Sequence, residues 1–117
     1  MRDVAPRPIS GGELAVVRQA LSVALKKDSP QIPDDALENL IVVAECECGC
    51  RSVAFECGAG VDQQLADGVG VLASGDRIDV IVWGRNSEIS SLEFVDHLGI
   101  AELPIKVISW EAAGHAS

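Results

Sequence analysis

The stretch Ile41–Cys57, with the sequence IVVAECECGCRSVAFEC, limits the possible folds of this chain more than any other segment. Two runs rich in β-branched and small apolar residues flank Glu47–Cys50, and Gly49 supplies the backbone freedom that a tight turn needs. Such runs on either side of a glycine-containing turn are typical of a β-hairpin. The stretch therefore predicts two antiparallel strands joined by a tight turn.

The side chains of this hairpin also predict its register. With Cys48 and Gly49 at the centre of the turn, one face is apolar except near the tip, and the other face suits water. The expected pairs are Cys46–Arg51, Ala44–Val53 and Val42–Phe55, with Leu40 beside Cys57. The residues expected to face water are Glu45, Glu47, Cys50, Ser52 and Glu56. A shift by one residue would place Glu45 opposite Val53, and we do not expect it because it turns every side chain to the other face.

Two helices are expected before the hairpin. Ser10 and Glu13 have the spacing of a capping box, and leucine and valine follow at helical intervals, which predicts a helix over 11–27. Pro33 followed by two aspartates marks the start of a second helix of about two turns that stops near Asn39.

More strands are expected after the hairpin. The best of them are 77–83 and 89–95, for which a five-residue loop would align Ile78 with Phe94 and Val80 with Leu92. A glycine-loosened edge strand over 64–72 and a last strand over 105–110 complete the pattern. Helices followed by a run of strands indicate an α+β fold. We therefore expect two N-terminal helices packed on a mostly antiparallel sheet of five or six strands.

The chain has the length of one domain, and we expect residues 1–117 to form it, with 1–9 as an extended arm and 111–117 as a mobile tail. Its 18 acidic and 9 basic side chains give a net charge of −9, which argues against nucleic acid or an anionic membrane as partner. A basic protein partner fits this charge. The first residues show no signal peptide, so we expect a cytoplasmic protein whose thiols are reduced. The oligomeric state stays open.

The cysteines allow two interpretations. Cys46, Cys48 and Cys50 lie on alternate residues and can gather at the hairpin tip, where three thiolates would suit Zn or another soft metal ion. Cys57 lies about six residues from the tip, on the order of 20 Å, which is too far for the same ion. In the other interpretation Cys46 and Cys57 fill apolar space, the remaining two are turn residues, and the protein has no cofactor.

The sequence shows no catalytic constellation. The two histidines, His97 and His115, lie in a loop and in the tail, away from any recognisable nucleophile motif. Glu93 and Asp79 are expected to lie near each other on neighbouring strands, as a solvated pair of carboxylates. The two tryptophans, Trp83 and Trp110, are expected near the outer face of the sheet, where they would anchor a partner or cap the sheet edge.

The segment Cys46-Glu-Cys-Gly-Cys50, with Ser52-Val53, the strand Val80–Trp83 and Ile89-Ser90-x-Leu92-Glu93-Phe94, resembles a group of small uncharacterised bacterial proteins. Their shared pattern is a C-x-C-G-C hairpin followed by an apolar strand and an L-S-x-L-E strand. The resemblance covers roughly 41–95 and implies a stand-alone bacterial domain. It implies no known activity and favours the cysteine tip and Glu93 as site residues.

These observations favour a small non-enzymatic protein that acts by binding another protein. The size, the acidity and the missing catalytic constellation suit an immunity- or antitoxin-like neutraliser. The alternative is a metal-binding module that uses the hairpin tip.

Overall fold

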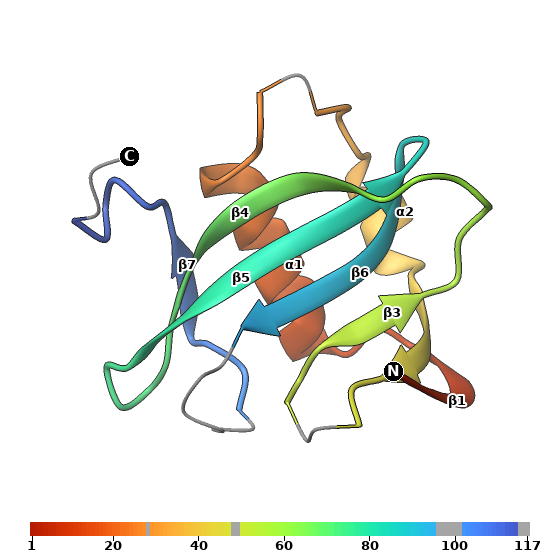
Figure 1. Cartoon of the computed structure of the whole chain (residues 1–117), viewed down its shortest axis with the longest axis horizontal. Helices are drawn as coiled ribbons and strands as arrows, with labels where there is room; N and C mark the ends of the chain where they lie inside the picture. Colours follow the sequence, from red (N-terminus) through yellow and green to blue (C-terminus); the bar gives the residue numbers. More distant parts are fainter. Residues whose placement is uncertain (28, 48–49, 96–101, 115–117) are drawn as a thin grey trace.

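The computed structural model describes residues 1–27, 29–47, 50–95 and 102–114. In this part of the chain seven strands form one sheet, in which every pairing is antiparallel and the order is β1-β2-β3-β6-β5-β4-β7 (Figure 1). The strands are β1 (Arg2–Pro8), β2 (Ile41–Glu45), β3 (Val53–Phe55), β4 (Gln63–Val71), β5 (Arg77–Arg85), β6 (Glu88–Val95) and β7 (Lys106–Ile108).

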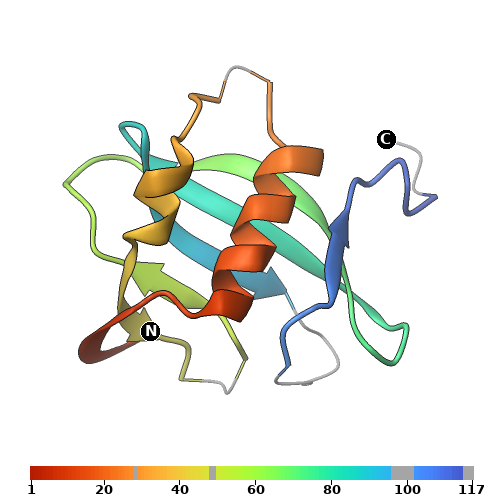
Figure 2. The same ribbon diagram turned by 180° about the vertical axis from the view of Figure 1, so that it is seen from behind.

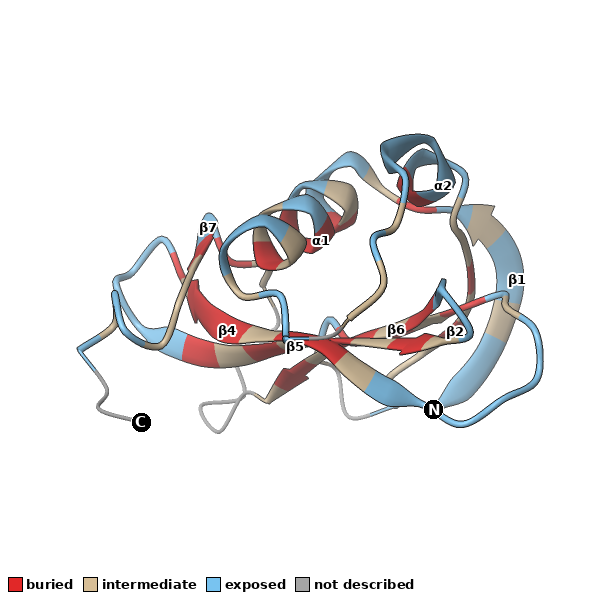
Figure 3. Cartoon of the chain, turned by 90° about the horizontal axis from the view of Figure 1, so that it is seen from above, coloured by how far each residue is buried: buried red, intermediate tan, exposed pale blue. Residues whose placement is uncertain are grey.

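The two helices lie on one side of this sheet. Figures 2 and 3 show α1 (Gly11–Val23) and the single short turn of α2 (Asp34–Glu38) over the same face, and α1 packs against β4, β5 and β7. The core lies between α1 and the sheet, where Val17, Ala20, Val42, Val80 and Leu92 are all fully buried. Among the described residues no helix is long and apolar enough to cross a membrane.

The expected arrangement of two N-terminal helices on five or six strands is therefore wrong. The chain begins with a strand, the described sheet has seven strands, and the helices are short, with 13 and 5 residues. The missed strand is β1, which sequence analysis treated as an extended arm because of Pro6 and Pro8. Proline has no N–H to donate, but an edge strand is bonded on one side only and tolerates it. β1 is such an edge, since it pairs with β2 alone.

The start of α1 is as expected, and its end is not. The Glu13 N–H donates to the Ser10 hydroxyl at 3.1 Å, and the Ser10 N–H donates to the Glu13 carboxylate at 2.9 Å, which completes the capping box. The helix ends at Val23 instead of residue 27 because the next backbone groups bond to β4. Lys26 donates its N–H to the Leu65 carbonyl, and the Ala24 carbonyl accepts from Asp67.

The hairpin of β2 and β3 exists, but only part of its expected register is right. Val42 lies opposite Phe55, as predicted. Between Val42 and Ala44 the register shifts, so that Ala44 lies opposite Ala54 and Glu45 lies opposite Val53. An extra residue on one strand is a β-bulge, which turns all later side chains of that strand to the other face. Glu45 consequently lies on the helix side, where its side chain keeps 37% of its surface exposed.

The hairpin of β5 and β6 is displaced by two residues from the expected register. Val80 lies opposite Phe94 and Val82 opposite Leu92, because a two-residue turn at Asn86 and Ser87 joins the strands and the register shifts once more between Trp83 and Gly84. Both turn residues have positive φ, 48° and 71°, which is the geometry of a type I′ turn. Beyond this irregularity the shift is by an even number and keeps each side chain on its expected face, so the apolar side of both strands still packs under α1, and Ile89, beside the turn, joins it.

Candidate functional site at the outer face of the sheet

The face of the sheet that points away from α1 and α2 is here called the outer face. Register places side chains of β4, β5 and β6 on it in rows across the strands. These residues are Asp67, Asp79, Ile81, Trp83, Ser91, Glu93 and Val95. In Figure 3 both helices lie on the other side, so no described helix covers these side chains.

Several residues singled out in the sequence meet in one hollow on this face. Cys46, Cys50, Trp83 and Glu93, which lie far apart in the chain, line a hollow of about 480 Å³, called here the outer hollow. Its remaining lining residues are Met1, Ser52, Asp62, Ser91 and Phe94. They come together because β3 pairs with β6, with Val53 opposite Leu92, which brings the hairpin tip beside the middle of the sheet.

Trp83 and Glu93 form the polar contact at the centre of this hollow. The Trp83 indole N–H donates to a Glu93 carboxylate oxygen at 2.9 Å. The second oxygen of Glu93 has no hydrogen-bond partner, and no Lys or Arg side chain lies within ion-pair distance of this carboxylate, in the part of the chain that the structure describes. Both residues are half-buried. The hollow thus contains a negative charge without a counter-charge.

Ser52 ties the hairpin tip to β6, which sequence analysis missed. Its hydroxyl accepts from the Phe94 N–H at 2.8 Å and from the Cys50 thiol at 3.3 Å. The expectation that Ser52 faces water is wrong, because this serine is buried with 4% of its surface exposed. A serine beside a strand gives no sequence signal for such a bond, since its partner is 42 residues away.

Asp62 stands at the rim of the hollow and is already paired. Its carboxylate accepts from the Arg85 guanidinium and, at 2.9 Å, from the Ser90 hydroxyl. The bond from Arg85, with a smaller contribution from Ser90, holds the pKa of Asp62 below its ordinary value. The charge of Asp62 is therefore compensated by Arg85, whereas Glu93 has no such partner among the described residues.

The second tryptophan lies at a different place. The Trp110 indole N–H donates to the Asp67 carboxylate at 3.1 Å. Asp67 is a residue of β4 whose side chain lies on the outer face. Trp110 is half-buried and does not line the outer hollow. Nearby, the Ala113 carbonyl accepts from Arg77 at 2.7 Å, so part of the expected tail contacts the end of β5. Residues 115–117 lie outside the described part of the chain, and the mobility of the tail stays a prediction.

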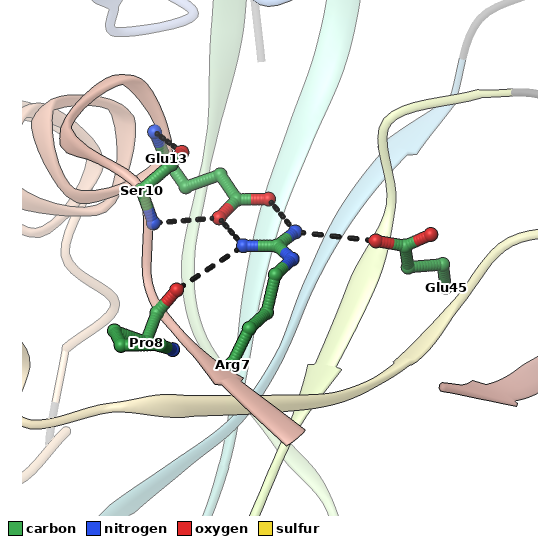
Figure 4. Close-up of polar contacts among 5 residues, drawn as sticks. All are labelled: Arg7, Pro8, Ser10, Glu13 and Glu45. Atoms are coloured by element: carbon green, nitrogen blue, oxygen red, sulfur yellow. Dashed lines mark hydrogen bonds and ion pairs between the residues drawn. The ribbon is translucent and has the colours of Figure 1, made fainter. Parts of the chain in front are cut away.

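A second hollow, of about 350 Å³, adjoins the same cysteines on the helix side of the hairpin and contains an ion-pair cluster. Figure 4 shows the Arg7 guanidinium between two glutamates, with both bonds to Glu13 at 2.9 Å and one to Glu45 at 3.3 Å. Burial acts to raise the pKa of Glu13, but the bonds from Arg7 and Ser10 outweigh it, and the pKa lies below its ordinary value. The bond with Glu13, helped by the bond with Glu45, raises the pKa of Arg7. This cluster joins β1, α1 and β2, and its one cation contacts both carboxylates.

The described residues include only part of the expected metal site. Cys50 and Cys57 have free thiols, Cys46 is disulfide-bonded, and Cys48 lies outside the described residues. The disulfide departs from the expectation of reduced thiols. A metal needs thiolates, so the prediction of a site at Cys46, Cys48 and Cys50 applies to the reduced protein. Among the described residues no group of three or more His, Cys, Asp or Glu could hold a metal. Elemental analysis of the reduced protein, purified without added metal, tests the prediction: a content far below one equivalent contradicts it.

Cys57 lies apart from the tip, as its distance along the hairpin predicts. It is half-buried and lines a separate hollow beside α2, together with Leu40 and Glu56. His97 and His115 lie outside the described residues.

Comparison with models of protein families, with curated proteins and with solved structures gives no match for this chain, and the resemblance to small bacterial proteins with a C-x-C-G-C hairpin stays a prediction.

Proposed function

We propose that the protein acts by binding a basic protein partner on the outer face of its sheet. The observation that supports this most is the arrangement of that face. Trp83 and Ile81 lie on it between carboxylates, and two of these, Asp79 and Glu93, have no cation partner among the described residues.

Each part of this arrangement suits an interface. Tryptophan is enriched among the residues that contribute most to binding energy, and both tryptophans have their N–H groups held by carboxylates of this face. Complementary charge speeds the encounter of two proteins and excludes wrong partners. With a net charge of −9 for the whole chain, this electrostatic term favours a basic partner.

The simpler explanation is a solvated sheet face, which antiparallel sheets commonly present. It accounts for the polar residues but does not require the two half-buried tryptophans. A neutraliser of the immunity or antitoxin type, whose target is a basic protein, is one specific form of the proposal. The size and acidity of the chain suit that form.

The test compares two charge reversals. Affinity capture from a lysate of the native host at low salt, followed by mass spectrometry, is carried out with wild-type protein, Asp79→Lys and Asp35→Lys. Asp79 lies on the outer face and Asp35 lies on α2, on the other side of the sheet. We expect a basic protein that is captured at low salt, released at high salt, and lost with Asp79→Lys only.

Circular dichroism and thermal unfolding establish that both variants fold before the capture is compared. An empty capture at low salt contradicts the proposal. A partner that both variants retain equally, or that Asp35→Lys alone releases, contradicts the outer face as the binding surface.

A further inference from the structure

We infer that the outer hollow takes up one cationic side chain of the partner, an arginine or a lysine, with Glu93 as its counter-charge. This inference rests on the proposed function and specifies which chemical group of the partner the face recognises. Three features of the hollow support it: one uncompensated charge, an aromatic wall and a suitable size.

Among the described side chains of the hollow, the charge without a cation partner is that of Glu93. A half-buried carboxylate loses part of its hydration, and a bond from a neutral indole N–H does not replace a counter-ion. The other carboxylate of the hollow, Asp62, is neutralised by Arg85. Among the described side chains one negative charge therefore remains, which suits a monovalent cation and disfavours an anion. A divalent metal is disfavoured, because the described residues offer no group of three ligands.

The wall comes from Trp83. Its indole lines the hollow while its N–H is directed to Glu93, so the ring is held in place beside the charge. Cations are attracted to the face of an indole, and arginine also stacks on it. Met1 and Cys50 add further lining that suits the methylene stem of a long side chain.

The volume of about 480 Å³ lies within the range of sites for small ligands, about 300–1,000 Å³. The hollow therefore has room for one long side chain and the backbone beside it. It opens on the outer face, where the proposed partner would lie, and it adjoins the free thiol of Cys50.

The test uses small probes and the two indole N–H signals of a ¹⁵N-labelled protein. The probes are N-acetyl-arginine methylamide, its lysine counterpart and N-acetyl-citrulline methylamide, which is the neutral isostere of the first. A Trp110→Phe variant assigns the two signals. Trp110 then serves as an internal reference, because it is bonded to Asp67 and lies outside the hollow.

We expect the arginine or the lysine probe to shift the Trp83 signal in a saturable way, with the Trp110 signal unchanged and no saturable shift from citrulline. Glu93→Gln retains an oxygen that can accept from Trp83 and should weaken binding about tenfold. The matched control is Asp67→Asn, which makes the same kind of change beside Trp110 and should leave the probe affinity unchanged.

The inference is overturned if neither cationic probe gives a saturable shift, if citrulline binds equally, or if Glu93→Gln binds as well as wild type. Its failure differs from a failure of the proposed function. If Asp79→Lys loses the captured partner but no probe binds, the outer face is still the binding surface and the hollow does not take up the cation. If a probe binds but the wild-type capture is empty, the hollow binds cations and the proposal of a protein partner is contradicted.

Discussion

Replacing Glu13 by glutamine tests the cluster that joins β1, α1 and β2. Glu13 is the most deeply buried charged residue among those described, with 1% of its surface exposed. Glutamine has the same length and retains an oxygen that can accept from the Ser10 N–H, so the capping box survives. The change removes the negative charge and presents an amide N–H to a guanidinium N–H of Arg7, where two donors now meet.

The structure sets the size of the effect. Glu13 receives two bonds of 2.9 Å from Arg7, and hydrogen bonds to charged groups contribute about 1.5–3 kcal/mol. The Arg7 side chain is 35% exposed and keeps its bond to Glu45, so it partly recovers hydration and a partner. We therefore expect a loss of about 2 kcal/mol in the free energy of unfolding. For a domain of this size that lowers Tm by roughly 8 °C.

The effect should depend on pH with a defined sign. The pKa of Glu13 in the folded protein lies below its ordinary value of 4.5. The ionised form therefore stabilises the folded state at every pH above that value, and the stabilisation is lost as the pH falls through the folded pKa. The gap in stability between wild type and Glu13→Gln should be constant from neutral pH to about pH 5 and should shrink at lower pH.

Urea unfolding followed by circular dichroism, repeated at several pH values, measures this gap. Glu38→Gln is the matched control, because Glu38 also accepts from an arginine, Arg18, at 2.8 Å, but this pair is exposed to solvent. Exposed ion pairs contribute little, so the control should unfold close to wild type. The reasoning is refuted if Glu13→Gln loses no more stability than Glu38→Gln, or if the gap at about pH 3 equals the gap at about pH 7.

Three further substitutions test the turn, the packing and the tie between strands. Gly84→Ala should destabilise by about 1–3 kcal/mol in urea unfolding, because a Cβ at Gly84 would lie 2.7 Å from the Glu88 carbonyl oxygen. Ser87→Gly should raise Tm by a few degrees, about 0.5–1 kcal/mol, because Ser87 has a φ of 71° that glycine adopts without strain. Ser52→Ala should cost about 1–3 kcal/mol, since it leaves the Phe94 N–H buried without an acceptor.

Two controls separate these effects from generic ones. An added Cβ at Gly11 meets no atom within 4 Å, so Gly11→Ala should not destabilise. Ser91 lies on the outer face with no side-chain hydrogen bond among the described residues, and Ser91→Ala should leave stability near wild type. Equal losses at Ser52 and Ser91, or at Gly84 and Gly11, would contradict the assigned contacts, as would a lower Tm for Ser87→Gly.

Local signals in the sequence predicted local structure well. The capping box of Ser10 and Glu13 and the helix start at Pro33 depend on residues within one turn, and both are present. Val42 and Phe55 are paired as expected. The β-bulge after Val42 was not predictable, because no glycine or other turn residue marks it. Its consequence is a distant contact, the bond that Arg7 donates to Glu45 once the bulge has turned Glu45 to the helix side.

The candidate site was not predictable as a unit. Cys50, Trp83 and Glu93 were each singled out from the sequence, but for separate reasons. The pairing of β3 with β6 brings them into one hollow, and this contact joins segments about forty residues apart. Sequence patterns predict which face of a strand is apolar, but they do not predict which strands become neighbours when the connections are long.

The turn at Asn86 and Ser87 determines the electrostatics of the outer hollow. The register expected from a five-residue loop would place Glu93 opposite Asp79, a pair of like charges that repel across the strands. The two-residue turn and the register shift between Trp83 and Gly84 together slide β6 by two positions and place Glu93 opposite Ile81, diagonal to Trp83, to which it bonds. Beyond that irregularity the displacement is by an even number and keeps each side chain of β6 on its expected face, whereas Ile89, beside the turn, joins the core. On the outer face the displacement separates two carboxylates and leaves one of them beside an indole.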